Sequence, residues 1–577
     1  MILTALTQYY ERLAAQNRIP PIGFAPAKVS YALCLDERGG LVQTVCLLDR
    51  VTRGKKETLV PRIMEAPEPV KRTAGIAANF LCDNASYLLG IDQKGRPART
   101  AQCFAAAKAR HETLLGGVDS PAARAVLAFF DRWNPNGAAD HPALRESWEG
   151  LTGGANLVFR FDGAFVQDDP GVREAWLRRA SFAGRAAPCL VTGRTDAPPA
   201  RLHPSIKGVA GAQSSGASLV SFNAEAFCSY GKEQGENAPV SQYAASAYGA
   251  ALNWLLSDRE HRQTIGDATV VFWSEDGDPI LQDLGMGALF GPGDRISHAD
   301  LKRAMGDLAQ GRKTNWEDRE IDPDTPFYIL GISPNAARLS VRFFWRNTLG
   351  GLMERSKAHY DRLEIQVPAY EKFHDLPVWR LLGETVSQNS RDRIPSPVMA
   401  GDVMRAILND GPYPASLEHG VLLRIRAEQD VTWRRAAILK AIVQKNLPDS
   451  HPAKEVAAME LNENSCYQPY VLGRMFALFA CIQKNALPNI NVTIKDKYFG
   501  SAASTPLTIF PVLTAFAQNH LKKLSTGSRI YFEKKLAALH DKITYTLPSR
   551  HTLAEQEAFY IGYYHQTQSL YAKKEEK

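Results

Sequence analysis

The chain of 577 residues carries a formal net charge of +7, with 45% hydrophobic and 22% charged residues. This length suggests about three or four domains, and the composition is that of a folded globular protein rather than a disordered one. The mild basicity allows nucleic-acid binding without requiring it, and no run reaches about 18 apolar residues, so we expect no membrane contact.

The first predicted element is an amphipathic helix at the N-terminus, with Leu3, Leu6, Tyr10 and Leu13 on one side and Pro20 beyond its end. It lacks the basic and apolar regions of a signal peptide. The eight cysteines include no Cys-x-x-Cys pair, which argues against a zinc ribbon and favours a reducing compartment. We therefore expect a cytoplasmic protein with no bound metal.

Residues 29–48 predict a β-hairpin, because two β-rich stretches flank Gly39 and Gly40. Two helices are expected after it, at 99–116 and 120–133. Residues 327–345 predict two strands joined at a Ser-Pro-Asn turn. In the second strand Leu339, Val341 and Phe343 alternate with Arg338, Ser340 and Arg342, which predicts one buried face and one basic face. The basic face could be a solvated sheet surface or a nucleic-acid platform.

From about residue 395 the pattern becomes helical, and residues 446–457 read as a polar, proline-broken linker. The segment from 459 onward holds 14 Lys and Arg against nine Asp and Glu, most of the excess charge of the chain. We predict an α+β protein: a mixed N-terminal α/β region with antiparallel strands, followed by an all-α C-terminal helical bundle. The expected domains are 1–130, 131–390, a helical connector at 391–457, and a bundle at 458–577.

The sequence offers no convincing catalytic centre. The acidic stretch 274–279 lacks the later glutamate of a calcium loop, because Gly285 stands in that place, so a turn is the simpler interpretation. The charged stretch 257–261 is explained by an exposed helix end. We therefore predict no catalytic residue, no metal ligand and no cofactor, although residues brought together only by the fold could still form a metal-dependent nuclease.

Two segments combine cations, amides and small residues. Lysine and arginine neutralise phosphates, whereas Asn and Gln amides offer a donor and an acceptor to a base edge. A P-loop is excluded, because Lys207 precedes the small residues and Gly216 is followed by Ala217. Each segment alone could equally be a turn that only connects strands. The candidates are Lys71, Arg72, Thr73, Asn79 and Asn84 in the first segment, and Lys207, Gln213, Ser214, Ser215, Asn223 and Lys232 in the second.

Four long segments carry a family resemblance. They are KRTAGIAANFLCDNASYLLGID, ARLHPSIKGVAGAQSSGASLVSFNAEAFCSYGKEQGENAPVS, ILGISPNAARLSVRFF and TIKDKYFGSAASTPLTIFPVL. These segments resemble the large subunit of the type I-C (Dvulg subtype) CRISPR Cascade surveillance complex. They occur in the order of that family, and the resemblance runs from about residue 20 to residue 571.

The resemblance implies a catalytically inert subunit of an RNA-guided complex. Such a subunit recognises the protospacer-adjacent motif (PAM) on duplex DNA, helps to part the strands for R-loop formation, and recruits the helicase–nuclease that cuts. The implied partners are the CRISPR RNA, the target double-stranded DNA, the Cascade backbone subunits, the subunit that caps the 5′ end of the CRISPR RNA, copies of the small subunit, and the helicase–nuclease.

Within that resemblance, the candidate residues would meet the duplex near the motif. We expect Lys207 on a phosphate, Gln213 or Asn223 near base edges, and Lys71, Arg72 and Asn79 as the other half of the site.

The resemblance also implies a second product, because the C-terminal part resembles the Cascade small subunit and is made from an internal start. Met459 would begin a product of 119 residues, with Val456 as a rival start.

Two other functions stay open from the sequence: a metal-dependent nuclease acting on nucleic acid, and a scaffold that never touches bases.

Overall fold

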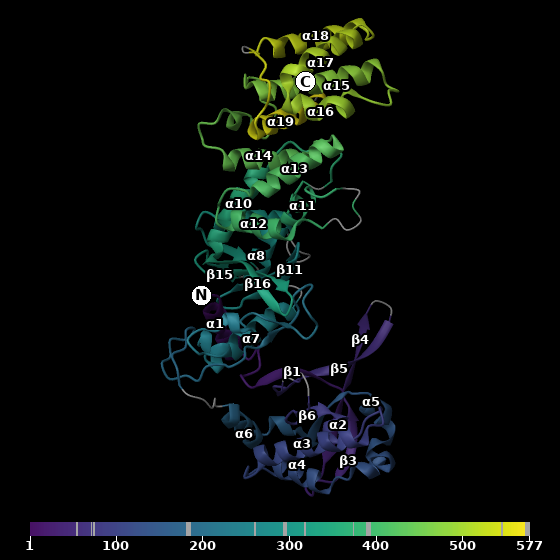
Figure 1. Cartoon of the computed structure of the whole chain (residues 1–577), viewed down its shortest axis with the longest axis vertical. Coiled ribbons are helices and arrows are strands. Elements are labelled where there is room, and N and C mark those ends of the chain that lie inside the picture. The colour runs from purple at the N-terminus through teal and green to yellow at the C-terminus, as the bar shows by residue number, and fades with distance from the viewer. Residues whose placement is uncertain are drawn as a thin grey trace. The chain divides into compact units, whose positions relative to one another are not determined.

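The computed structural model describes residues 1–53, 56–70, 72, 75–180, 186–258, 261–291, 297–316, 319–372, 374–387, 390, 394–543 and 546–571. The chain divides into two compact units, which we describe separately. Unit 1 comprises Met1–Pro204 and Val220–Leu252, and unit 2 comprises Ser205–Leu219 and Asn253–Lys577. The predicted α+β class is confirmed, since the N-terminal sheets are mainly antiparallel and the C-terminal part is helical (Figure 1).

Unit 1 is built on a five-stranded sheet in the order β3-β2-β7-β6, with β8 paired to β7. Only β2 and β7 run parallel. A second sheet has the order β1-β5-β4. The strands are β1 (Phe24–Val29), β2 (Tyr31–Leu35), β3 (Leu41–Cys46), β4 (Leu48–Arg53), β5 (Lys56–Pro67), β6 (Cys82–Asn84), β7 (Asn156–Phe161) and β8 (Ala164–Phe165).

The predicted hairpin is confirmed as β2 and β3, which pair in an antiparallel register from Tyr31–Cys46 to Leu35–Leu41. Gly39 lies in its turn with a positive φ of 76°. A Cβ atom there would lie 2.4 Å from the backbone nitrogen of Phe129, so only glycine lets the turn approach this helix.

Helices cover the five-stranded sheet, and their side chains form one core with it. Phe129 and Phe130 of α4 pack in that core with Leu33 of β2 and Phe159 of β7. The predicted helices at the N-terminus, at 99–116 and at 120–133 are confirmed. The helices of unit 1 are α1 (Ile2–Ala15), α2 (Ala85–Leu88), α3 (Pro97–Leu115), α4 (Pro121–Arg132), α5 (Trp148–Thr152), α6 (Pro170–Ala180) and α7 (Gln242–Ser257), the last ending in unit 2.

Unit 2 contains a six-stranded sheet in the order β11-β12-β15-β16-β10-β9. Only β10 and β16 run parallel. A separate pair is formed by β13 and β14. The strands are β9 (Ser205–Ile206), β10 (Ala217–Ser218), β11 (Arg262–Ile265), β12 (Ala268–Ser274), β13 (Thr314–Trp316), β14 (Arg319–Ile321), β15 (Pro326–Asn335) and β16 (Arg338–Thr348).

The predicted single buried face of residues 338–343 is wrong. Leu339 and Phe343 are buried, but Val341 is 43% exposed. The register between β15 and β16 shifts at Gly331/Ile332, which leaves Arg342 as an extra residue between the pairs Ile332–Val341 and Gly331–Phe343. This β-bulge changes which residues face the core on either side of it, and alternation in the sequence does not reveal it.

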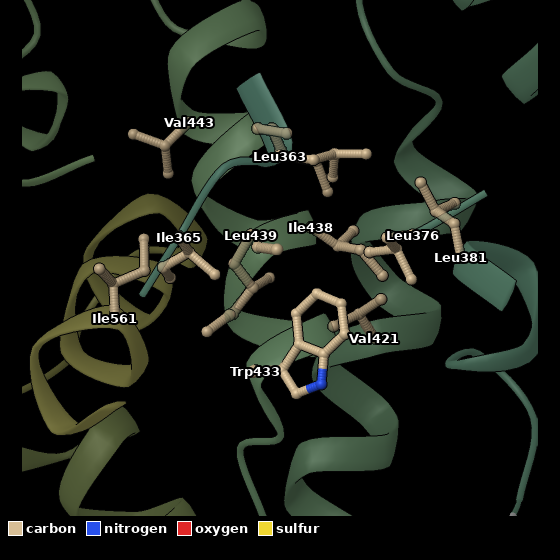
Figure 2. Packing of buried hydrophobic residues seen from close by; sticks show 14 of the residues in the cluster. Leu363, Ile365, Leu376, Leu381, Val421, Trp433, Ile438, Leu439, Val443 and Ile561 are labelled. Carbon is tan, nitrogen blue, oxygen red and sulfur yellow. The ribbon is translucent and has the colours of Figure 1, made fainter. Parts of the chain in front are cut away.

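The helices of unit 2 share one hydrophobic core that runs from the sheet to the C-terminal block. Figure 2 shows side chains of this core from several elements: Trp433, Ile438 and Leu439 from α14, Val421 from α13 and Ile561 from α19. The helices are α8 (Pro279–Phe290), α9 (His298–Leu308), α10 (Leu349–Leu363), α11 (Val378–Gly383), α12 (Pro397–Leu408), α13 (Ala415–Glu428), α14 (Trp433–Asn446), α15 (Gln468–Ala486), α16 (Ile494–Ser504), α17 (Pro506–Leu521), α18 (Thr526–His540) and α19 (Leu553–Tyr571).

The predicted linker at 446–457 is also wrong in part. It contains a short 3-10 helix, η6 (Pro452–Val456), and Ala453 and Val456 are fully buried in the shared core. Small apolar residues among prolines and charges gave no sign of that packing. Within the described residues, no helix is both long and apolar enough to cross a membrane.

Candidate nucleic-acid interface

The Gly/Ser-rich segment forms the connection between β9 and β10, at the edge of the unit 2 sheet. We call residues 207–216 the edge loop. β9 and β10 pair antiparallel at its base, through Ile206–Ala217 and Ser205–Ser218. The Ser218 N–H donates to Ala337 O at 3.0 Å, which ties β10 to the start of β16.

The base of the edge loop is held by side chains from neighbouring elements. The side-chain amide of Asn253 on α7 forms two hydrogen bonds with the backbone there. Its Nδ2 donates to Ser205 O (3.1 Å) and its Oδ1 accepts from the Lys207 N–H (2.8 Å). Arg262 Nη1 donates to Gly208 O (2.9 Å). Thr269 Oγ1 accepts from the Ala210 N–H (3.0 Å). These bonds fix the direction in which the loop leaves the sheet.

The tip of the edge loop is exposed and tightly turned. Lys207, Gln213, Ser214 and Ser215 are all exposed side chains. Two turns follow each other, closed by Ala212 N–H to Val209 O (3.1 Å) and by Gly216 N–H to Gln213 O (2.9 Å). The buried Val209 pins the middle of the loop. A cation, an amide and two hydroxyls therefore project from a short loop with a fixed base.

Asn223 and Lys232 belong to unit 1, in a segment of turns and short 3-10 helices from 220 to 238. Both side chains are exposed. The Asn237 side chain organises this segment, because it accepts from the Ser229 N–H (2.9 Å) and donates to Lys232 O (3.2 Å). The backbone around Lys232 is thereby held in place while its ammonium group faces solvent.

The first predicted segment, residues 71–84, differs from the edge loop, because its described candidate side chains bind other groups within the chain. Lys71 and Thr73 lie outside the described residues. Arg72 is bound within the chain: its guanidinium pairs with both carboxylate oxygens of Asp83, its Nε donates to Ala77 O (2.6 Å), and it lies 4.0 Å from the centre of the Tyr87 ring. Asp83 is only 1% exposed.

Asn79 and Asn84 also have internal partners. Asn79 Oδ1 accepts from the Val70 N–H (3.0 Å), which closes the loop between the two residues. Asn84 is the N-cap of α2, with its Oδ1 accepting from the Ser86 N–H (3.0 Å). The structure thus uses these amides to shape the backbone.

The acidic stretches flagged in the sequence have structural partners. Asp278 is the N-cap of α8, where its Oδ1 accepts from the Ile280 N–H (2.9 Å), and Arg319 pairs with it at 3.0 Å. His261 Nδ1 lies 2.8 Å from Asp258, whereas Glu260 lies outside the described residues. Among the residues that the structure describes, no group of three or more His, Cys, Asp or Glu could hold a metal ion.

Sequence reasoning missed the residues that anchor the edge loop. Asn253 was the one with a visible signal, as a lone amide in the otherwise apolar run 250–256. Arg262 and Thr269 sit in strands of ordinary composition, and only the fold brings them to the loop.

One known protein family matches the chain over a range that includes all of these segments. The family model described as CRISPR-associated protein (Cas_Csd1) matches residues 6–571. A search of curated proteins finds no significant match.

Proposed function

Because the chain belongs to the Cas_Csd1 family of CRISPR-associated proteins and is thus a Cascade subunit, we propose that it is the type I-C large subunit, which reads the PAM in duplex DNA. In this proposal base pairing with the guide RNA reads the target sequence. This chain reads the PAM, the short motif beside the target, which we call the flag. It then helps to part the strands and offers the surface on which the helicase–nuclease docks, without itself cutting.

The observation that carries the proposal is the edge loop. Asn253, Arg262 and Thr269 hold the backbone of residues 205–210, and the loop exposes the side chains of Lys207 and Gln213. Small residues at the tip let the backbone approach a groove that larger side chains could not enter. A lysine supplies affinity through a phosphate, and an amide supplies discrimination at a base edge.

The other candidates differ in exposure. Asn223 and Lys232 are exposed, and each is assigned to DNA on that ground. Arg72, Asn79 and Asn84 have partners within the chain, so in our proposal they act on DNA only by shaping the loop 70–84. Lys71 and Thr73 stay assigned to DNA on the strength of their side chains alone.

Two substitutions in the edge loop test this function in the assembled complex. Lys207→Ala should weaken binding of all duplexes alike and reduce the salt slope of log K by about one. Gln213→Ala should instead change the preference among flags. Lys302→Ala, an exposed lysine on α9, is the matched control. Unchanged binding in both edge-loop variants would refute the assignment.

The inert character of the chain is tested separately. The complex without its helicase–nuclease is incubated with target DNA and magnesium or manganese. We expect intact DNA, and hydrolysis by the purified chain would favour the nuclease alternative.

We further propose that the small subunit is made from an internal start at Met459. This residue is half-exposed, and the chain after it is anchored to α15 within the same product. Arg474 Nη1 donates to Asn462 O (3.1 Å) and Glu463 O (3.3 Å), and Tyr470 Oη accepts from the Asn462 N–H (3.0 Å). A product beginning at Met459 retains all of these bonds.

Replacing Met459 with Ile tests the start site. Expression of the variant should abolish a short product of 119 residues, identified by its intact mass, while the full-length chain persists. A product that survives with a mass beginning at residue 456 would favour Val456 instead.

A further inference from the structure

The turn at residues 229–232 holds an aromatic side chain in an unfavourable backbone conformation. The Lys232 N–H donates to Ser229 O at 3.0 Å, and the two central residues, Tyr230 and Gly231, have φ values of 54° and 67°. Positive φ at both central positions defines a type I′ turn, for which Asn, Asp or Gly is the usual first central residue. A tyrosine there is held against its own preference.

Packing of the tyrosine ring within the chain does not offset this unfavourable conformation. Its side chain is 97% exposed, more than any other large apolar or aromatic residue in the described part of the molecule. The conformation therefore cannot be explained by burial of the ring in this chain.

Hydrogen bonds from a neighbouring side chain hold the turn in place. The Asn237 side chain binds both ends of it, accepting from the Ser229 N–H (2.9 Å) and donating to Lys232 O (3.2 Å), and it also donates to Gln234 O (3.0 Å). Glu233 and Glu236 form a capping box immediately after the turn. A rigid support thus presents the ring to solvent at little further cost in conformational entropy.

A cation stands beside the ring on the turn itself, ahead of Glu233 and Glu236. Lys232 is exposed two residues after Tyr230, so a flat aromatic face and a cation project from the same braced turn. Proteins that hold unpaired strands use this pair of groups, the ring stacking on a base and the cation neutralising a phosphate.

We propose that Tyr230 stacks on an unpaired DNA base next to the flag, with Lys232 on an adjacent phosphate. This inference rests on the proposed function and extends it, because stacking requires a base that has left the duplex. The turn would hold the strands apart once the flag has been recognised.

The test uses the assembled complex and a forked DNA whose bases are unpaired beside the flag. Tyr230→Asn suits the turn better than tyrosine, so the variant should melt no lower than wild type. It should nevertheless bind forked DNA at least about 5-fold more weakly, the effect of losing one stacked base. Tyr230→Phe should bind like wild type. Tyr370→Asn, at a tyrosine that is 83% exposed, should change nothing.

The outcomes separate this inference from the proposed function. If wild-type complex prefers flagged over scrambled DNA but Tyr230→Asn binds forked DNA like wild type, the stacking role is refuted and the function stands. If wild type ignores the flag, the proposed function fails whatever the variant does. A variant that loses guide RNA rather than DNA affinity would overturn the assignment to DNA.

Discussion

Replacing Arg72 with Ala should destabilise part of unit 1 rather than only weaken DNA binding. The guanidinium pairs with Asp83, which is 1% exposed. Among the described residues, removing the guanidinium leaves this buried carboxylate with the backbone N–H groups of Asn79 and Asn84, each at 2.9 Å. Breaking a buried ion pair from one side costs about 3–5 kcal/mol. Because the Arg72 side chain is 28% exposed, we expect the lower end, about 3 kcal/mol.

Hydrogen exchange of the amides from 79 to 88 measures this loss in unit 1 without assuming that the whole chain unfolds in one step. Arg96→Ala is the matched control, because the Arg96 side chain is 53% exposed and its ion pair with Asp92 spans 3.9 Å, so it should change protection by less than about 1 kcal/mol. The double variant Arg72→Ala, Asp83→Ala should recover part of the loss, since no unpaired charge remains. If Arg72→Ala kept wild-type protection but lost duplex binding, its guanidinium would act on DNA directly.

Three further outcomes follow from the structure. Gly216→Ala should distort the edge loop and weaken DNA binding, because its φ is 92° and a Cβ would lie 2.9 Å from Ile206 O; a DNA affinity equal to that of the helical control Gly306→Ala would contradict this. Burial and the carboxyl of Glu418 raise the pKa of Glu557, so Glu557→Gln should raise the melting temperature at pH 8 but not at pH 4.5, and an equal effect at both pH values would count against the raised pKa. Burial lowers the pKa of His111 to about 4, so the unfolded chain gains its proton first as the pH falls below about 6.5. Between pH 6.5 and 5, wild type should therefore lose about 2 kcal/mol more unfolding free energy in urea than His111→Gln, and parallel losses would refute this.

The sequence was informative where a local rule decides the structure. The hairpin of β2 and β3 followed from Gly39 between two β-rich stretches, and the N-terminal helix followed from the apolar spacing of Leu3, Leu6, Tyr10 and Leu13. Prediction from the sequence failed where contacts between residues far apart in the chain determine the structure. The bulge at Arg342 reverses an alternation that reads as regular, and Val456 enters a core to which the sheet and the helices of unit 2, α14 and α19 among them, contribute.

The candidate site shows the same division. The exposed tip of the edge loop could be predicted from its small and polar residues, because no partner in the chain is needed to expose them. The role of Arg72 could not, although Asp83 stands only 11 residues away in the sequence, because only the fold turns that carboxylate into the core. The sequence did not single out Tyr230, because no local sequence pattern distinguishes an exposed aromatic residue from a buried one.

The most direct test of the account compares flagged and scrambled target duplexes in binding to the assembled complex. Two complexes are measured, one with the wild-type chain and one in which Gln213, Ser214 and Ser215 are all replaced with Ala. We expect the wild-type complex to prefer the flagged duplex and the variant to bind both alike, with the same guide RNA content. A variant that keeps the full wild-type preference would contradict the claim that the edge loop reads the flag.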